Sequence, residues 1–315
     1  MWTRPWNMKE GFTLGAGLLF SGILLQLSCG PVDWSLLCWP KNLISILIFA
    51  AVMVTVFILR RKYYILRRIA TASCAVPAIV YAVLLTVVMG LLRQAPSTRD
   101  ATDPIGLTKM LSFWPFILTY LWMTVVLSQV TIRQILHPSW RRMPSLLSHA
   151  GLLIILTCAT VGSGDIQRLK MICEQGQPEW RAVDNKENVV ELPIAIQLNK
   201  FILEEYEPEL IEADDSTRFY SPRRDPKRFA SEVQLLTQSG KNIVTTIEVN
   251  KPFEIEGWKI YQYGYDQQAG AMSTMSIFEL VTDPWQTAVY IGIYLLLSGA
   301  VLMFITMRKR KEASV

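Results

Sequence analysis

Six long apolar runs, each almost free of charged residues, constrain this chain more than any other feature. They are 12–28, 43–59, 70–92, 113–132, 146–161 and 287–307. A helix needs about 20 apolar residues to cross a hydrocarbon core of about 30 Å. Backbone groups in lipid have to be hydrogen-bonded within their own segment, so each run predicts a membrane-spanning helix. We expect a membrane region with five spans at 1–163, and a last span with a basic tail at 286–315.

The first and fifth runs have features that set them apart. Leu27-Ser28-Cys29-Gly30 is similar to a lipoprotein cleavage site, so the first run could be a cleaved signal. Gln26 stands where such sites usually hold Leu, and five more spans follow, so we expect the first run to remain a span. The fifth run is the shortest and carries His149 near its start.

Charge divides the chain by sign. Residues 164–285 carry 13 Lys+Arg and 21 Asp+Glu, whereas the rest carries 18 and 5. The positive charges gather in the short loops that follow the second, fourth and sixth runs. Cytoplasmic loops of membrane proteins are rich in Lys and Arg. We therefore expect an inner (cytoplasmic) membrane protein with both termini in the cytoplasm and residues 164–285 in the periplasm.

Residues 164–285 predict one β-rich domain inserted before the last span. Apolar residues alternate with polar ones, as on one face of a strand: they are Leu192, Ile194, Ile196 and Leu198. Runs 232–237 and 243–249 flank a Gly-containing turn, as in a β-hairpin. Residues 207–228 are rich in Pro, Asp, Ser and Arg, which predicts a long exposed loop. The expected class is an α-helical polytopic membrane protein with an all-β-rich extracytoplasmic domain.

No catalytic residue is predicted in this domain. It contains no His, and its acids, such as Asp214 and Asp215, lack metal-ligand spacing. An aromatic set could form a binding surface or lie on alternate faces of a half-buried strand. It consists of Trp258, Tyr261, Tyr263 and Tyr265.

The two histidines of the chain differ in their surroundings. His137 lies in a basic loop beside Pro138, which indicates a solvated side chain. His149 lies where an apolar run begins, and an ionisable residue there is costly unless it is paired or functional. Neutral imidazole binds metals and haem iron. His149 is therefore a candidate metal ligand or proton site; the alternative is a helix-end histidine that faces lipid headgroups.

The five cysteines show no CxxC spacing, which excludes thioredoxin-type and covalent haem-attachment signatures. Cys29 and Cys38 share one loop and could form a disulfide there. Cys74 and Cys158 are expected to be small apolar core residues. The fifth, Cys173, is the only cysteine of the predicted β-rich domain.

Five stretches occur in a specific order around the predicted domain. They are 113–120 (FWPFILTY), 147–152 (LSHAGL), 162–169 (GSGDIQRL), 253–266, and 279–285 (ELVTDPW) followed by the final span. Together they resemble the ResB/CcsB family of system II cytochrome c biogenesis proteins, in a ResB-like form not fused to CcsA. The resemblance covers about residues 70–315.

The resemblance implies a subunit of a cytochrome c synthase, co-catalytic or non-catalytic, that works with a CcsA/ResC-type membrane protein. The pair would export haem b and present it to the CxxCH thiols of an apocytochrome c. His149 would be one axial ligand of the iron, with the second from the partner. Arg141 and Arg142 could pair with the haem propionates.

Further partners follow from the same resemblance. They are a thioredoxin-like reductant and membrane lipid, whereas the basic loops are explained by topology rather than by nucleic acid. Some family members carry a reactive cysteine in this half, and Cys158 and Cys173 are the nearest candidates.

Two other classes of function compete with this one. A membrane-anchored scaffold or sensor with a partner-binding β-rich ectodomain would share the topology but would not need His149. A small-solute transporter is disfavoured, because the spans contain almost no acidic residues and no obvious inverted repeat.

Overall fold

The computed structural model describes residues 6–95, 101–207, 210–213, 217–220 and 226–312. The chain divides into two units. A helical unit consists of Met1–Asp165 with Pro284–Val315, and a strand unit consists of Ile166–Asp283.

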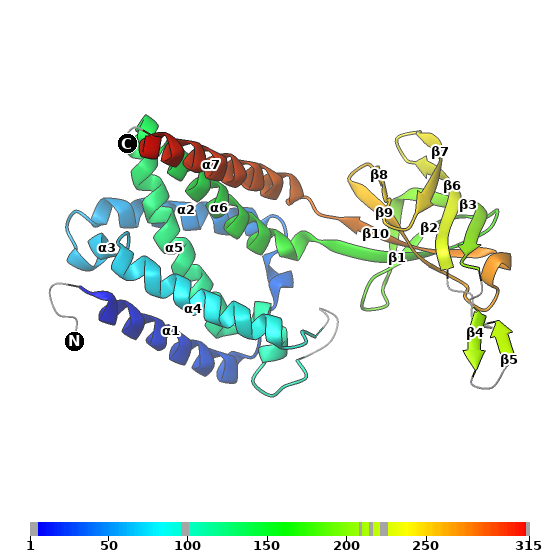
Figure 1. Ribbon diagram of the computed structural model, residues 1–315, viewed down its shortest axis with the longest axis horizontal. Coiled ribbons are helices and arrows are strands. Elements are labelled where there is room, and N and C mark those ends of the chain that lie inside the picture. The colour runs from blue at the N-terminus through cyan, green and yellow to red at the C-terminus, as the bar shows by residue number, and fades with distance from the viewer. Residues whose placement is uncertain (1–5, 96–100, 208–209, 214–216, 221–225, 313–315) are drawn as a thin grey trace. The chain divides into compact units, whose positions relative to one another are not determined.

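Six long helices form the described part of the helical unit, and each coincides with one apolar run (Figure 1). They are α1 Met8–Cys29, α2 Lys41–Leu59, α4 Ala72–Leu91, α5 Trp114–Leu136, α6 Met143–Gly162 and α7 Gln286–Glu312. The shorter elements are α3 Tyr64–Arg68, η1 Trp34–Leu37, η2 Leu107–Ser112, η3 Trp140–Arg142 and η4 Ser163–Asp165. All six long helices are long and apolar enough to cross a membrane. The chain is a multi-pass membrane protein, as predicted.

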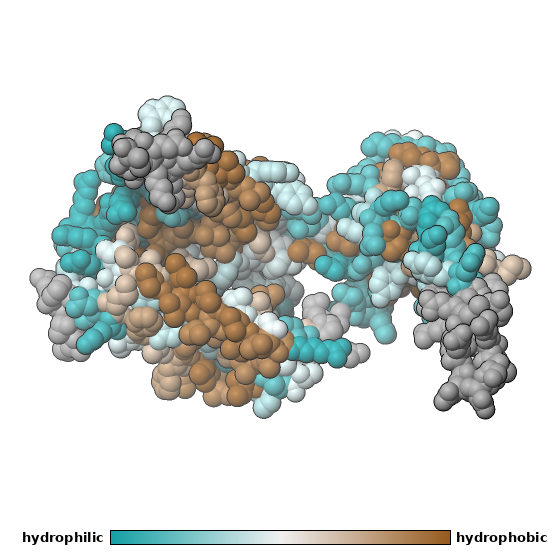
Figure 2. All heavy atoms as spheres, viewed as in Figure 1, coloured by the Kyte–Doolittle hydropathy of each residue, from teal (hydrophilic) through white to brown (hydrophobic). Residues whose placement is uncertain are grey.

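The helices turn large apolar side chains outward. Leu27, Leu91 and Phe304 expose 70%, 80% and 77% of their surface. Figure 2 shows broad brown, hydrophobic areas over these helices, whereas most of the strand unit is teal. Soluble proteins rarely expose apolar areas of this size, and lipid tails are the solvent that such a surface suits.

Helix α5 is the most enclosed of the six. Of the residues in its most apolar 18-residue stretch, 44% are buried, against 11–17% in the corresponding stretches of the other five spans. Its Trp122 indole donates to the Sγ of Cys74 on α4 at 3.2 Å, and its Gln129 amide donates to the carbonyl of Met53 on α2 at 2.9 Å. Cys74 is 2% exposed, which confirms its predicted place in the core.

Buried hydroxyl groups on α5 are satisfied within the helix. Each donates to the backbone carbonyl four residues earlier, and they belong to Thr119, Thr124, Ser128 and Thr131. Polar side chains in lipid need such partners, because no water is available. By contrast, Gln129 and Gln134 reach across to neighbouring helices.

Helices α6 and α7 approach each other through small residues. A Cβ on Gly151 would lie 2.5 Å from the Gly292 carbonyl oxygen, and a Cβ on Gly299 would clash with Ser148. Small residues let helix backbones pack closely in membranes, where van der Waals contact drives association. The face of α6 that carries Ser148 and Gly151 therefore packs directly against α7.

The strand unit is built on one eight-stranded antiparallel sheet with the order β7-β6-β3-β2-β1-β10-β9-β8. The strands are β1 Gln167–Glu174, β2 Pro178–Val183, β3 Val189–Glu205, β6 Pro226–Thr237, β7 Asn242–Glu248, β8 Phe253–Ile255, β9 Trp258–Tyr265 and β10 Met275–Thr282. A short turn, η5, spans Gly270–Met272. The first and last strands, β1 and β10, pair along their whole length, from Gln167 opposite Thr282 to Glu174 opposite Met275.

The sheet is rolled. Strands β7 and β8 are its two opposite edges, yet they follow each other in sequence with only a turn between Glu248 and Phe253. The edges therefore have to come together. Rolling leaves little free strand edge, which protects a sheet from pairing with other chains.

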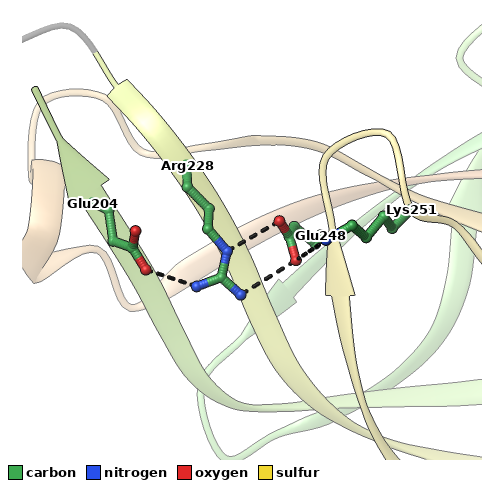
Figure 3. Close-up of polar contacts among 4 residues, drawn as sticks. All are labelled: Glu204, Arg228, Glu248 and Lys251. Carbon is green, nitrogen blue, oxygen red and sulfur yellow. Dashed lines mark hydrogen bonds and ion pairs between the residues drawn. The ribbon is translucent and has the colours of Figure 1, made fainter.

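Ion pairs join neighbouring strands near the turn between β7 and β8, as Figure 3 shows. Arg228 on β6 bonds Glu204 on β3 at 2.7 Å and Glu248 on β7 at 3.0 Å. Lys251, in the turn before β8, bonds Glu248 at 3.2 Å. The four charges join three adjacent strands and the turn that links the two sheet edges.

The interior of the rolled sheet is apolar and follows the predicted alternation. Leu192 is 6% exposed, and Ile194, Ile196 and Leu198 are fully buried. The predicted hairpin is also confirmed, because β6 and β7 pair from Ala230 opposite Glu248 to Leu236 opposite Asn242.

Two expectations need correction. The predicted loop 207–228 contains β4 Leu210–Ala213 paired with β5 Thr217–Tyr220, and β6 already begins at Pro226. The remaining parts at 208–209, 214–216 and 221–225, including Asp214 and Asp215, lie outside the described residues. The considered disulfide is not formed, since Cys29 and Cys38 are both free thiols. Cys38 instead donates to the carbonyl oxygens of Ser35 and Gly164.

Candidate functional site around His149

The predicted site residues lie at one end of α6. Arg141 and Arg142 belong to the 3-10 turn η3, and α6 follows at once with Pro144 in its first turn. Proline suits this position because it has no N–H that needs a partner there and its φ is already helical. His149 lies in the second turn and is half-buried.

The neighbour that sequence reasoning missed is Gln134, in the last turn of α5. Its Oε1 lies 3.0 Å from His149 Nδ1, and its Nε2 donates to Ser145 Oγ at 3.0 Å. Ser145 Oγ is itself 3.5 Å from His149 Nδ1. Gln134 is 8% exposed, so the amide at the centre of this cluster is buried between α5 and α6, whereas Ser145 and His149 are half-buried.

The placement of the Gln134 amide, with Oε1 toward His149 and Nε2 toward Ser145, favours a proton on His149 Nδ1. An amide oxygen only accepts, so the group facing it at 3.0 Å has to be an N–H. Neutral imidazole carries one proton, and placing it on Nδ1 leaves a lone pair on Nε2. Within the described residues, Nε2 makes no hydrogen bond. Metal-binding histidines typically show this arrangement: one nitrogen donates to a protein oxygen, and the other binds the metal.

Arg141 and Arg142 remain without a carboxylate. Both are exposed, and no described acid bonds either guanidinium. Among the residues that the structure describes, no hydrogen bond joins either arginine to His149. Seven residues separate Arg142 from His149, which corresponds to about 10 Å of rise and nearly two full helical turns. The two side chains therefore start from about the same side of α6.

An apolar crevice is a separate feature of the helical unit. Two adjoining cavities of about 320 and 230 Å³ share Trp34, Ile117, Tyr120 and Thr160. Tyr120 lies 14 residues before Gln134, about 21 Å away along α5. The crevice and His149 therefore lie toward opposite ends of the spans.

The predicted aromatic surface is divided by a β-bulge. Tyr263 and Gly264 together oppose Ile277, so the alternation of β9 changes at this point. Tyr263 is 51% exposed and has Lys170 Nζ 4.1 Å from its ring centre. Tyr265 instead stacks on Phe201 at 4.9 Å between ring centres. Tyr263 and Tyr265 therefore have different surroundings and do not share a face.

Comparison with known families shows what the part of the chain around this site is similar to. The model of the ResB-like family matches residues 138–279. Residues 138–279 are ResB-like. None of the curated proteins compared with the chain matches it.

The ResB-like segment includes α6, with the candidate site at its start, and most of the strand unit. It covers Arg141, Arg142, Ser145 and His149, and it ends within β10. The family resemblance found in the sequence is thereby confirmed over residues 138–279. A ResB-like segment points to involvement in cytochrome c biogenesis.

Gln134 lies four residues before the ResB-like segment begins. The sequence does show that Gln134 is a polar amide at the end of an apolar span, and such a side chain needs a hydrogen-bond partner. The sequence alone does not say which helix supplies that partner.

Proposed function

We propose that this chain is the histidine-bearing membrane subunit of a system II cytochrome c synthase. Its substrate is haem b, which the complex exports and presents to the CxxCH thiols of an apocytochrome c. The observation that carries the proposal is His149 itself: within a ResB-like segment, Nδ1 is held by Gln134 while the lone pair on Nε2 makes no bond to a described residue.

The donor set suits one side of a haem. Haem supplies an iron with two axial positions and two anionic propionates. Nε2 of a neutral histidine is a common axial ligand, and its coordinate bond is reversible, unlike a thioether. Among the described residues, no three His, Cys, Asp or Glu side chains gather into a metal site. In this proposal the second ligand of the iron would come from the CcsA/ResC-type partner.

Arg141 and Arg142 suit the propionates. Guanidinium groups form bidentate bonds with carboxylates, and these two have no carboxylate partner in the described part of the chain. Their separation from His149, about two helical turns, is on the scale of a porphyrin. Binding the propionates would also neutralise two negative charges at the membrane edge.

We further propose the orientation that the charges favour. The basic loops lie in the cytoplasm, both termini lie there too, and residues 164–285 lie in the periplasm of an inner-membrane protein. The strand unit then meets haem or apocytochrome c outside the membrane. A thioredoxin-like reductant supplies the reduced thiols on which the attachment depends.

An absorption spectrum of the chain purified together with its CcsA-like neighbour tests the proposal. The wild-type pair is expected to show a reduced b-type haem spectrum and to support cytochrome c maturation. His149→Ala should lose most of that haem, whereas His137→Ala, which alters an exposed histidine, should retain it. Arg141→Gln with Arg142→Gln should weaken loading.

The opposite result favours a different class of protein. If the His149→Ala pair keeps its haem and cytochrome c still matures, His149 is structural. The chain is then better described as a membrane-anchored scaffold or sensor with a partner-binding ectodomain.

A further inference from the structure

We propose that Gln134 is a positioning residue that holds His149 as the Nδ1–H tautomer and so keeps Nε2 ready to bind iron. The role in iron binding rests on the proposed function; the tautomer itself does not. Three contacts carry the inference: Gln134 Oε1 to His149 Nδ1 at 3.0 Å, Gln134 Nε2 to Ser145 Oγ at 3.0 Å, and Ser145 Oγ to His149 Nδ1 at 3.5 Å.

The Gln134 amide bridges Ser145 and His149. Its NH₂ group lies toward the Ser145 hydroxyl, which accepts, and its oxygen lies toward the imidazole. A reversed amide would place N–H against Nδ1 and would force the proton onto Nε2. Ser145 is one helical turn before His149 on α6, so the same helix supplies both the ring and the hydroxyl that the other end of the Gln134 amide binds.

The choice of an amide over a carboxylate has a chemical consequence. A carboxylate beside Nδ1–H would make the imidazole a stronger donor to iron and would place a charge in the membrane. An amide oxygen fixes the tautomer without adding charge. A neutral, moderately basic ligand suits a haem that has to be released to an apocytochrome.

In the competing explanation, Gln134 only stabilises the packing of α5 against α6. Helix α5 offers a matched control for it. Gln129 is also buried, and its amide donates to the Met53 carbonyl on α2 at 2.9 Å. It stabilises a helix contact without touching His149. Gln129→Leu should therefore reproduce any general loss of packing and leave the imidazole unchanged.

The decisive measurement is nitrogen NMR of the full chain in detergent, without haem, with only histidine labelled by ¹⁵N. The chain has two histidines, so His137→Ala assigns the signals. Wild type and Gln129→Leu should show His149 protonated on Nδ1, with a free, unprotonated Nε2. Gln134→Leu should shift the ring toward the Nε2–H form, and Gln134→Glu should restore Nδ1–H.

Either of two results overturns the inference. One is a wild-type His149 protonated on Nε2. The other is a Gln134→Leu chain that is folded by the same criteria as Gln129→Leu and still shows Nδ1–H. Because no haem is present, both results are independent of the proposed function, whose failure would appear only in the absorption spectrum of the His149→Ala pair.

A second measurement connects the tautomer to iron. In the purified haem-loaded pair, Gln134→Glu should lower the haem reduction potential relative to wild type, because a more basic imidazole favours ferric iron. Gln129→Leu should not move it. Equal potentials in wild type, Gln134→Glu and Gln134→Leu would show that Gln134 does not act through the iron ligand.

Discussion

The carboxylate of Asp165 accepts a 2.7 Å hydrogen bond from the indole nitrogen of Trp285, although the two residues are 120 positions apart in the sequence. The same carboxylate accepts from the backbone N–H of Trp39 and from the side-chain amide of Asn42, which is fully buried. One acid thus ties the end of α6 and the start of α7 to the start of α2.

Removing this acid should destabilise the helical unit. Asp165→Ala leaves three donors without an acceptor, and hydrogen bonds to a charged group contribute about 1.5–3 kcal/mol each. Trp39 is exposed, so its N–H can bond water instead. Two bonds at the lower end of that range give an expected loss of about 3 kcal/mol in the free energy of unfolding, seen as a lower melting temperature in detergent. Trp285→Phe removes one of the donors and should cost about 1.5 kcal/mol; an equal loss in both variants would contradict the shared role.

The α6–α7 contact should not tolerate a side chain at Gly151. A Cβ there would lie 2.5 Å from both the Gly292 carbonyl oxygen and the Leu296 amide nitrogen. Gly151→Leu should therefore separate the helices, at a cost of about 1–3 kcal/mol for overpacking. The temperature at which the variant aggregates in detergent measures this loss of stability. Gly17→Leu is the control, because a Cβ at Gly17 meets nothing within 4 Å.

The thiol of Cys173 should be inert in the folded protein. It is fully buried in the core of the strand unit, and burial raises its pKa to about 12, so almost no thiolate forms at neutral pH. Maleimide should label the exposed Cys29 within minutes and Cys173 only after denaturation, as read by mass spectrometry. Rapid labelling of native Cys173 would restore it as a candidate reactive cysteine.

The strand unit should lose stability in acid through Glu179. Hydrogen bonds from Arg181 lower the pKa of Glu179 from 4.5 to about 2. The folded state thus prefers the ionised form, so this stabilisation is complete above pH 4.5 and is lost as pH falls toward 2. Glu179→Gln should be less stable than wild type at pH 7, and chemical denaturation should show the difference shrinking over that range. A constant difference down to pH 2 would contradict the assignment.

Patterns along the chain predicted the parts of the fold that depend on local chemistry. Charge-free runs located all six long helices, and alternation placed Ile194 and Ile196 in the interior of the sheet. Composition failed at 207–228, where polar residues suggested a loop but β4 and β5 pair. A pair of short strands depends on its partner strand, and that partner is not visible in residue frequencies.

The site was predicted only in part for the same reason. His149 was conspicuous because an ionisable residue is rare in a span, but its bond to Gln134 joins two helices and depends on how they pack. The bulge at Tyr263 likewise depends on how β9 pairs with β10, so the sequence left open whether the aromatic residues form one surface or lie on alternate faces.

The full-length pairing of β1 with β10 makes the strand unit an inserted module that can be exchanged as a whole. Its two ends leave the sheet side by side, at Gln167 and Thr282. Within the helical unit, the two points of attachment are likewise neighbours, because Asp165 and Trp285 are in contact. Residues 166–283 should therefore be replaceable by a short linker, or by the equivalent module of another protein. The positions of the six long helices should not change.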